Sequence, residues 1–384
     1  MNILVLLPSL VDLLGGMEAF SRAFVKALDE IAEEDGHRVT VLALRDTGLN
    51  PLADRYLTRR RTSYHGFSEN RFHFSATAML HARKADVCFV GSVNFMRIVR
   101  LLGPARKFLI VYGTEVWERV PHLNKRSFDC LTGVLAISDF TRRQMVGCNP
   151  VSEDIIQVFP CTLDPYYEEH VQRSRSLPPV ALPKGKLLLS VSRLNDDRDT
   201  CRKNIHVVIQ AMPQILARVP DAYYVVVGEG GGRAKLQQMA RDCGVAGHVV
   251  FTGRVSDDFL PQYYAACDTF ILPSTQEGFG IVFLEAMYSA KACIGARSGG
   301  IPEVIQDRRT GLLFDPNDPG SLAEAAIELL ENEPLRLAMG GAGRERLNAN
   351  FKFEHFRGRL QKILRAAGLG AEPDQIAFGV GVQA

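Results

Sequence analysis

The chain has 384 residues, of which 46% are hydrophobic and 23% are charged, and its formal net charge at pH 7 is +2. This composition excludes a disordered or fibrous protein, and the length is sufficient for two globular domains. Because the net charge is small, it gives no general attraction to nucleic acid, and no nucleic-acid partner is expected.

The first part of the chain alternates strand and helix. Residues 3–7 have no basic segment before them and no small-residue cleavage site after them, so we expect a buried strand rather than a leader. The alternation predicts βαβ units and a doubly wound parallel sheet in a first domain at residues 1–168. The predicted elements are a strand at 3–7, a turn at Gly15 and Gly16, a helix at 19–33 and strands at 36–42, 85–90, 107–111 and 133–136.

A second alternation follows a polar, proline-bearing segment that is predicted to be a linker at residues 169–185. It predicts a second Rossmann-like domain at 186–350, and therefore an α/β protein with two such halves. An amphipathic helix is predicted at 351–366 and a flexible tail at 367–384. The second domain's predicted elements are strands at 187–191, 223–227, 249–251, 269–272 and 292–295, and helices at 205–219, 233–243 and 321–332.

The segment 274–286, Ser-Thr-Gln-Glu-Gly-Phe-Gly-Ile-Val-Phe-Leu-Glu-Ala, sets Glu277 and Glu285 on either side of a Gly-Phe-Gly turn that opens an apolar helix. Such a turn presents free backbone N–H groups to a phosphate, and carboxylates accept hydrogen bonds from hydroxyls. The pattern therefore indicates a nucleotide sugar. The alternative is an ordinary turn and an ordinary helical glutamate. The apolar run at 270–273 favours the ligand site, because ligands bind at such strand ends.

Two cations, Arg193 and Lys203, are predicted near the end of the strand at 187–191. They are suited to neutralise charge on a departing diphosphate, although cations at loop edges are also commonly just solvated. Between them, Asp197 and Asp199 form an Asp-x-Asp that is typical of metal-diphosphate sites. Neighbouring arginines can bind phosphate without an ion, and loop aspartates commonly cap helices, so no metal is expected.

Two glycine clusters could bind a ligand, and one of them superficially resembles a dinucleotide fingerprint. The cluster that begins at Gly228 follows a predicted strand, but no acid ends the next strand, which disfavours an NAD site. Gly15 and Gly16 allow close approach of a phosphate or acceptor, or form an ordinary tight turn.

The remaining composition points to a cytoplasmic protein without a cofactor. The eight cysteines are scattered, with neither a Cys-x-x-Cys pair nor a histidine cluster, which argues against a disulfide framework and a metal site. No apolar run reaches membrane-spanning length.

Taken together, these stretches resemble glycosyltransferase family 4, the retaining GT-B enzymes also described as group 1 glycosyl transferases. The resemblance extends over residues 15–364 and is strongest in the second half. It implies two Rossmann-like domains facing a central cleft, a terminal helix that returns to the first domain, and catalysis without a metal. The matching pieces are Gly15-Gly16, Gly36-His37-Arg38-Val39, Gly113-Thr114-Glu115-Val116-Trp117, Ala136-Ile137-Ser138, Ser192-Arg193-Leu194, Lys203-Asn204, Gly228-Glu229-Gly230, Phe251-Thr252-Gly253-Arg254-Val255, Glu277 to Glu285, and Gly299-Gly300-Ile301-Pro302-Glu303.

The resemblance also implies residue roles. Glu277 would hold sugar hydroxyls, Glu285 the ribose, and Arg193 and Lys203 the diphosphate, with Glu277, Arg193 and Lys203 forming the catalytic set. The implied donor-binding set is Gly15, Gly16, Arg193, Lys203, Gly228, Arg254, Val255, Glu277, Gly278, Phe279, Gly280, Ile281, Val282 and Glu285.

Two departures from the family pattern concern the first half. Many members carry a histidine where this chain has Tyr112, so a histidine role does not transfer, and Tyr112 and Glu115 are assigned only to the acceptor side. Residues 159–164 also differ from the family's usual Pro-Asn-Gly-Val-Asp type sequence, which loosens the match near the domain boundary.

The predicted function is therefore retaining transfer of a sugar from a UDP- or GDP-type donor on the second domain to a saccharide or lipid-linked acceptor on the first, in envelope or polysaccharide synthesis. The alternatives are a GT-B sugar phosphorylase or epimerase, a dinucleotide-dependent redox enzyme, and a non-catalytic nucleotide-sugar sensor. We identify no enzymatic nucleophile.

A run of basic residues between 56 and 107 has only two acids, Glu69 and Asp86, to balance it. It suits an anionic membrane surface, at ~1 kcal/mol per cation, or else forms solvated helix faces. Peripheral membrane association is the corresponding prediction. The basic residues are Arg59, Arg60, Arg61, Arg71, Arg83, Lys84, Arg97, Arg100, Arg106 and Lys107.

Overall fold

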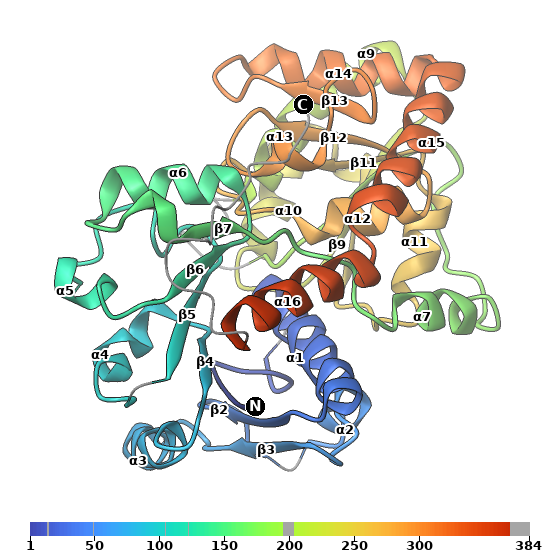
Figure 1. The fold of residues 1–384 in the computed structure, drawn as a ribbon. Helices are drawn as coiled ribbons and strands as arrows, with labels where there is room; N and C mark the ends of the chain where they lie inside the picture. Colours follow the sequence, from blue (N-terminus) through green and yellow to red (C-terminus); the bar gives the residue numbers. More distant parts are fainter. Residues whose placement is uncertain (14, 49, 104, 122, 195–202, 369–384) are drawn as a thin grey trace. The chain divides into compact units, whose positions relative to one another are not determined.

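The computed structural model describes residues 1–13, 15–48, 50–103, 105–121, 123–194 and 203–368. The chain divides into two compact units (Figure 1): unit 1 comprises Met1–Pro165 with the chain from Lys352 onward, and unit 2 comprises Tyr166–Phe351. Each unit has its own parallel sheet, which confirms the expected α/β class with two Rossmann-like halves. The predicted Asp197 and Asp199 motif and residues 369–384 of the predicted tail lie outside the described residues.

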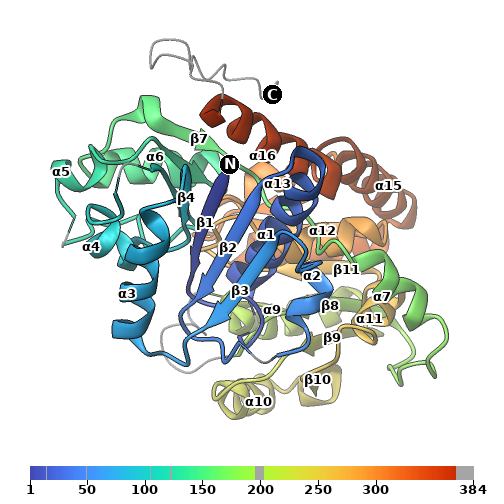
Figure 2. The ribbon, with the colours of Figure 1, turned by 60° about the horizontal axis from the view of Figure 1, so that its bottom comes forward.

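Unit 1 contains a seven-stranded parallel sheet in the order β3-β2-β1-β4-β5-β6-β7, with β3 at one edge (Figure 2). Most of its strands are continuous apolar runs, because a parallel sheet is covered on both faces. The edge strands β3 and β7 are short or polar and were not predicted from the sequence. The strands are β1 (Asn2–Leu7), β2 (Arg38–Ala43), β3 (Thr62–Gly66), β4 (Val87–Val90), β5 (Arg106–Val111), β6 (Gly133–Ala136) and β7 (Ile156–Val158).

The helices of unit 1 include the long α1, which ends at Gly36 in the left-handed conformation that favours glycine. The helices are α1 (Gly16–Asp35), α2 (Ala53–Tyr56), α3 (Arg71–Ala82), η1 (Val93–Phe95), α4 (Met96–Val99), α5 (Lys125–Phe128), α6 (Asp139–Cys148), η2 (Glu153–Ile155) and the terminal α16 (Phe353–Gly368).

The terminal helix α16 packs on α1 within unit 1, as expected. Phe356 lies in an aromatic cluster, with its ring centroid 5.3 Å from that of Phe20 and 4.7 Å from that of Phe159. Beside this cluster, Arg357 pairs with Glu30 at 3.2 Å and also with Glu34. Apolar contact and charge pairing therefore both join the chain's last helix to its first.

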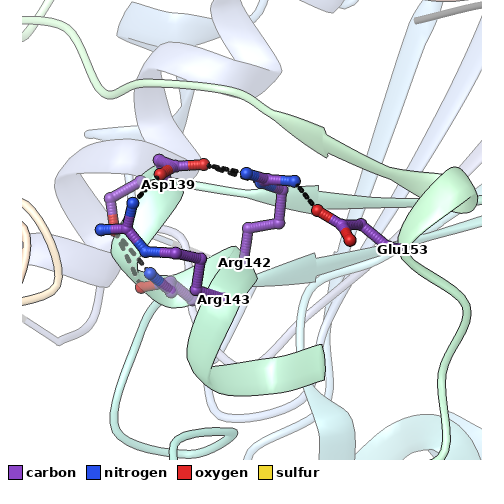
Figure 3. A network of polar contacts seen from close by, with 6 residues as sticks. Asp139, Arg142, Arg143 and Glu153 are labelled. Carbon is purple, nitrogen blue, oxygen red and sulfur yellow. Dashed lines mark hydrogen bonds and ion pairs between the residues drawn. The ribbon is translucent and has the colours of Figure 1, made fainter. Parts of the chain in front are cut away.

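The helix α6 is connected to the turn η2 by a polar network (Figure 3). Arg142 Nε donates to Asp139 Oδ1 at 2.7 Å, and the same guanidinium pairs with Glu153. Arg143 also pairs with Asp139. Because α6 begins directly after β6 and η2 leads into β7, these pairs stabilise the edge of the sheet.

Unit 2 contains a six-stranded parallel sheet in the order β10-β9-β8-β11-β12-β13. Its strands are β8 (Lys186–Val191), β9 (Ala222–Val227), β10 (Val249–Gly253), β11 (Thr269–Leu272), β12 (Ala292–Ala296) and β13 (Gly311–Phe314). Its helices are α7 (Tyr167–Ser174), α9 (Ile205–Arg218), α10 (Arg233–Asp242), η3 (Ala246–His248), α11 (Leu260–Ala266), α12 (Ile281–Tyr288), α13 (Ile301–Val304), α14 (Pro319–Glu331) and α15 (Glu333–Asn350).

The polar segment after residue 165 packs on unit 2. His170 Nδ1 lies 2.6 Å from Asp258 Oδ1, and Gln262 Nε2 donates to the carbonyl oxygens of Ser174 at 3.0 Å and Pro178 at 3.2 Å. The helix α7 is therefore part of the second unit.

Candidate active site

The strand order of unit 2 reverses between β8 and β11, which are neighbours in the sheet. Ligands of open α/β sheets bind outside the carboxyl ends of the strands at such a switch point. The loop after β8 carries Arg193, and the loop after β11 carries Glu277. The topology therefore brings two predicted site residues to the same edge of the sheet.

The loops after β8, β9 and β10 are tightly joined around Gly228. Its backbone N–H donates to the Gly253 carbonyl at 3.0 Å, and its φ of 146° favours glycine. A Cβ at this position would lie 1.8 Å from the carbonyl oxygen of Ser192. Arg193, the next residue, is exposed and pairs with no acid among the described residues, so its guanidinium is available to a phosphate.

Arg254 and Val255 follow Gly253 at the end of β10. Arg254 is exposed and Val255 is half-buried. Both directly follow Gly253, which is bridged to Gly228.

Lys203 and Glu277 contact each other although 74 residues separate them. The Nζ of Lys203 donates to Glu277 Oε2 at 2.5 Å, and the two side chains are 30% and 16% exposed. Asn204 orients this pair: its φ is 54°, and its Nδ2 donates to the Pro273 carbonyl at 3.0 Å and to Thr275 Oγ1 at 3.1 Å. The start of α9 is thereby attached to the loop after β11.

The loop after β12 supports the backbone of Glu277. The Gly300 N–H donates to the Glu277 carbonyl at 2.8 Å, and Ser298 Oγ donates to the Thr275 carbonyl at 2.8 Å. Gly299 has a φ of 61°, and a Cβ there would lie 2.4 Å from the Glu277 carbonyl oxygen. Glu277 is thus placed by its side chain, its main chain and a neighbouring loop.

The helix α12 begins after Gly280, whose φ of 93° favours glycine. The first N–H groups of a helix lack intrahelical acceptors, so Ile281 and Val282, both half-buried, carry amides suited to a phosphate. Gly278 is half-buried as well. Phe279 is 3% exposed and its ring packs on Phe351, so its side chain is part of the core.

Glu285 accepts a hydrogen bond from the buried Tyr264, with 2.6 Å between Tyr264 Oη and Glu285 Oε2. Burial, and then the charge of Glu285, raises the pKa of Tyr264 well above its ordinary value, so its hydroxyl stays protonated. Sequence reasoning missed Tyr264, because nothing in its local pattern connects it with a residue 21 positions later.

In unit 1, Gly15 immediately precedes α1 and Gly16 is its first residue. A Cβ on Gly16 would meet no atom within 4 Å, so neighbouring atoms do not require a glycine there. Tyr112 is buried, and its ring packs edge-on against Phe20 at 5.4 Å. Glu115 accepts from the Tyr112 N–H, and burial raises the pKa of Glu115. These contacts are structural, and the ligand roles of the four predicted residues stay predictions.

Asp46 shapes the same region and was not predicted. Its buried carboxylate accepts from Ser9 Oγ at 2.5 Å, Tyr64 Oη at 2.7 Å and the backbone N–H groups of Leu10 at 2.7 Å and Val11 at 3.1 Å. One anion therefore holds the loop that leads from β1 toward Gly15.

The ten predicted basic residues do not form one surface. The prediction is wrong for Lys107, which is buried and donates from Nζ to the carbonyls of Gly103 at 2.7 Å and Ala105 at 3.0 Å. Arg106 is half-buried and donates to the Ala367 carbonyl of α16. Both begin β5, where the chain enters the core, so their side chains bond to nearby carbonyls instead of facing solvent.

A hollow of about 1010 Å³ lies beside the edge strand β3 and is lined by Arg59, Arg60 and Arg61. The hollow belongs to unit 1, whose sheet does not contain β8 or β11, and its cations already have oxygen partners, so we do not assign the donor to it. Arg59 pairs with Asp54, Arg60 lies 4.0 Å from Glu33, and Arg61 donates to the Gly36 carbonyl at 3.2 Å.

The edge formed by the β8 and β11 loops combines three kinds of group. Arg193 and Lys203 are cations for a phosphate, α12 supplies backbone amides, and Glu277 and Glu285 are acceptors for hydroxyls. Within the described residues, no three His, Cys, Asp or Glu side chains gather as a metal site requires. The arrangement suits a molecule that has a diphosphate and hydroxyl-bearing ends.

Comparisons with known proteins agree with this chemistry. The family model described as glycosyl transferases group 1 matches residues 177–346. The chain is 32% identical over 278 residues to the GDP-mannose-dependent alpha-(1-6)-phosphatidylinositol monomannoside mannosyltransferase of Mycobacterium tuberculosis, covering 69% of this chain and 71% of that protein. It is 36% identical over 161 residues to the N-acetyl-alpha-D-glucosaminyl L-malate synthase of Bacillus anthracis, covering 42% of each.

Solved structures with similar folds cover nearly the whole chain. Anabaena Alr3699/HepE in complex with UDP is 18% identical, with a TM-score of 0.76, over 95% of this chain and 100% of that one. A glycosyltransferase from Rickettsia africae is 18% identical, with a TM-score of 0.77, over 97% and 99%. These likenesses confirm the GT-B class of fold expected from the sequence.

Proposed function

Because this chain belongs to the glycosyl transferases group 1 family and is a glycosyltransferase that uses nucleotide sugars, we propose that it is a retaining family 4 hexosyltransferase with a lipid-linked or saccharide acceptor. GDP-mannose is the donor to test first, because similar proteins are named as dependent on it. The observation that carries the proposed donor site is the 2.5 Å contact between Lys203 and Glu277.

This contact matches the covalent structure of a nucleotide sugar, in which the sugar is bonded directly to the second phosphate. A cation for that phosphate and a carboxylate for the sugar hydroxyls must therefore be neighbours. Lys203 and Glu277 are neighbours, and Arg193 follows the adjoining strand β8. The α12 amides would hold the diphosphate, and Glu285 the ribose.

In the proposed reaction, the bond between the anomeric carbon and the diphosphate oxygen breaks as a bond to the acceptor oxygen forms on the same face of the sugar. The acceptor's hydroxyl proton passes to the departing phosphate oxygen. Lys203 and Arg193 stabilise the charge that develops there, which is worth most when donors are already positioned. Glu277 holds the sugar so that its anomeric carbon faces the acceptor.

We propose a lipid-linked glycoside in cell-envelope synthesis as acceptor, with the enzyme acting peripherally at the inner face of the membrane. Support comes from relatives named for phosphatidylinositol monomannoside. No metal takes part in this proposal, because the two cations and the α12 amides already supply positive charge to the diphosphate.

The proposal is tested first by ligand-induced stabilisation. A ligand that binds only the folded protein raises its Tm. The Tm of wild type, of E277Q and of the exposed control E345Q is therefore measured with GDP, with UDP and with the corresponding nucleotide sugars. We expect one nucleotide family to raise Tm in wild type and E345Q, and the sugar moiety to add to the shift only when Glu277 is present. If no nucleotide raises the Tm of the folded protein, the donor-site assignment is wrong.

Turnover then separates the proposed transfer from its alternatives. We expect release of nucleoside diphosphate only when an acceptor is supplied, with a product whose anomeric configuration, read by proton NMR couplings, equals that of the donor. Turnover that requires inorganic phosphate would identify a phosphorylase, and conversion of the donor sugar without an acceptor would identify an epimerase. Either result would exclude the proposed transfer.

A further inference from the structure

The helix α3 of unit 1 is apolar on two sides. Phe74, Ala78 and Ala82, spaced four residues apart, are buried against the unit's core. Phe72 and Leu80, on a different face, are 86% and 62% exposed. A helix in a globular protein usually presents one apolar stripe to the core and polar residues elsewhere. The second stripe therefore requires another explanation.

A third large apolar residue lies on the turn after α4. Leu101 is 64% exposed, whereas its neighbour Leu102 is fully buried and anchors the turn. This turn lies against the end of α3, because a Cβ built on Gly103 would be 3.4 Å from the Ala82 carbonyl oxygen. Lys107 holds the turn in place through its bond to the Gly103 carbonyl. Figures 1 and 2 both show α3 and α4 as neighbours in unit 1.

Five exposed cations lie on the same two helices or directly after them, with Arg71 next to Phe72 and Arg100 next to Leu101 in the chain. None of them forms an ion pair with a residue that the structure describes. The nearby acids are already engaged, since Asp86 accepts from the Asn2 N–H at 2.7 Å and Glu69 lies 3.5 Å from Arg45. We call this face, with its apolar side chains, the α3–α4 surface: Phe72, Leu80, Leu101, Arg71, Arg83, Lys84, Arg97 and Arg100.

We propose that the α3–α4 surface docks on an anionic lipid bilayer, with Phe72, Leu80 and Leu101 inserted at the acyl boundary and the five cations among the lipid phosphates. Uncompensated cations next to exposed apolar side chains are the pattern of peripheral membrane contacts, because each group meets its preferred layer. Scattered exposed apolar residues need no explanation, but a patch edged by cations does. No described helix has the length and apolar character to cross a bilayer, so this contact is peripheral.

This membrane contact rests on the proposed function, because an enzyme that glycosylates a lipid held in the membrane must reach that lipid. Docking through unit 1 would leave the donor loops of unit 2 unchanged. The two proposals are therefore separable by experiment.

The experiment is liposome flotation of the full chain, with vesicles of phosphatidylcholine alone or mixed with phosphatidylglycerol. We expect wild type to float with the anionic vesicles, less so at high salt, and not with the neutral ones. R83E/R97E should lower partitioning by at least about 25-fold, because two cations contribute about fivefold each and reversed charges repel. F72S/L80S should lower it by at least about tenfold.

Matched controls lie in unit 2. L337S removes a leucine that is 61% exposed on α15, and K235E/R241E reverses two exposed cations on α10. Both should float as wild type does. The surface is wrongly assigned if wild type at low salt does not float with the anionic vesicles. It is also wrongly assigned if these controls lose binding as strongly as the α3–α4 variants.

Two further measurements on the same samples complete the test. The nucleotide-induced rise in Tm should be the same in F72S/L80S as in wild type. If wild type shows no such rise, the donor site is wrongly assigned, whereas the flotation result still tests the membrane surface by itself. The mass in solution, by light scattering, should show no dimer that F72S/L80S dissociates. Such a dimer would mean that a second copy of the chain covers this face, and would overturn the lipid proposal.

Discussion

Replacing Lys203 by methionine removes the ion pair with Glu277 while keeping a long apolar stem. Exposed pairs contribute ~0–1 kcal/mol, and breaking a buried pair costs ~3–5 kcal/mol. Since the two side chains are 30% and 16% exposed, the cost should lie between these limits. We expect K203M to lose about 1–2 kcal/mol of folding free energy, or about 3–6 °C in Tm.

Turnover should fall much further than stability. If Lys203 neutralises the departing diphosphate, K203M should lower kcat by ~10²–10³ at saturating donor, as loss of a positioned charge typically does. The arginine variant K203R keeps the charge and should retain more activity than K203M. The assay follows nucleoside diphosphate release, and K235M, which changes an exposed lysine of α10, serves as the control.

A double-mutant cycle isolates the contact itself. With K203M, E277Q and the double variant, urea unfolding should give a coupling free energy of at least about 0.5 kcal/mol. Turnover of K203M within about threefold of wild type would refute the assignment of Lys203 to the leaving group. Coupling near zero would refute the contact that places it beside Glu277.

Three further changes test the site and its supports. Y264F removes the hydroxyl that donates to Glu285. It should raise the KM for the nucleotide sugar by about fivefold to tenfold with kcat nearly unchanged. With a nucleotide sugar that carries a deoxyribose, Y264F should leave KM unchanged. G228A would place a Cβ 1.8 Å from a backbone carbonyl at a φ of 146°, so it should destabilise the protein by more than about 2 kcal/mol in urea unfolding, whereas G247A, with no atom within 4 Å, should be nearly neutral. Because the pKa of Glu115 is raised, the native state retains this proton to higher pH than the unfolded chain does. The stabilisation that Glu115 contributes to folding is therefore full below about pH 4.5 and is lost as pH rises through its folded-state pKa. E115Q should flatten that decline, and parallel stability curves for E115Q and wild type would contradict it.

The local sequence was sufficient to predict those elements whose conformation depends only on residues close together in the chain. The apolar runs became the buried strands of two parallel sheets, because such strands are covered on both faces. The Gly-Phe-Gly turn between Glu277 and Glu285 became the start of α12, since the positive φ of Gly280 is a property of one residue. The phosphate-binding role assigned to that turn stays a prediction.

Long-range contacts were decided by the tertiary structure alone. The order of the strands brings Lys203 to Glu277 and Tyr264 to Glu285, and no periodicity in the sequence encodes these distances. The same holds for burial: residue type alone would place a lysine at the surface and a phenylalanine in the core, yet Lys107 is 7% exposed and Phe72 is 86% exposed. A residue's own chemistry states what it can bind, whereas the packing of distant segments decides whether it meets solvent, a ligand or the core.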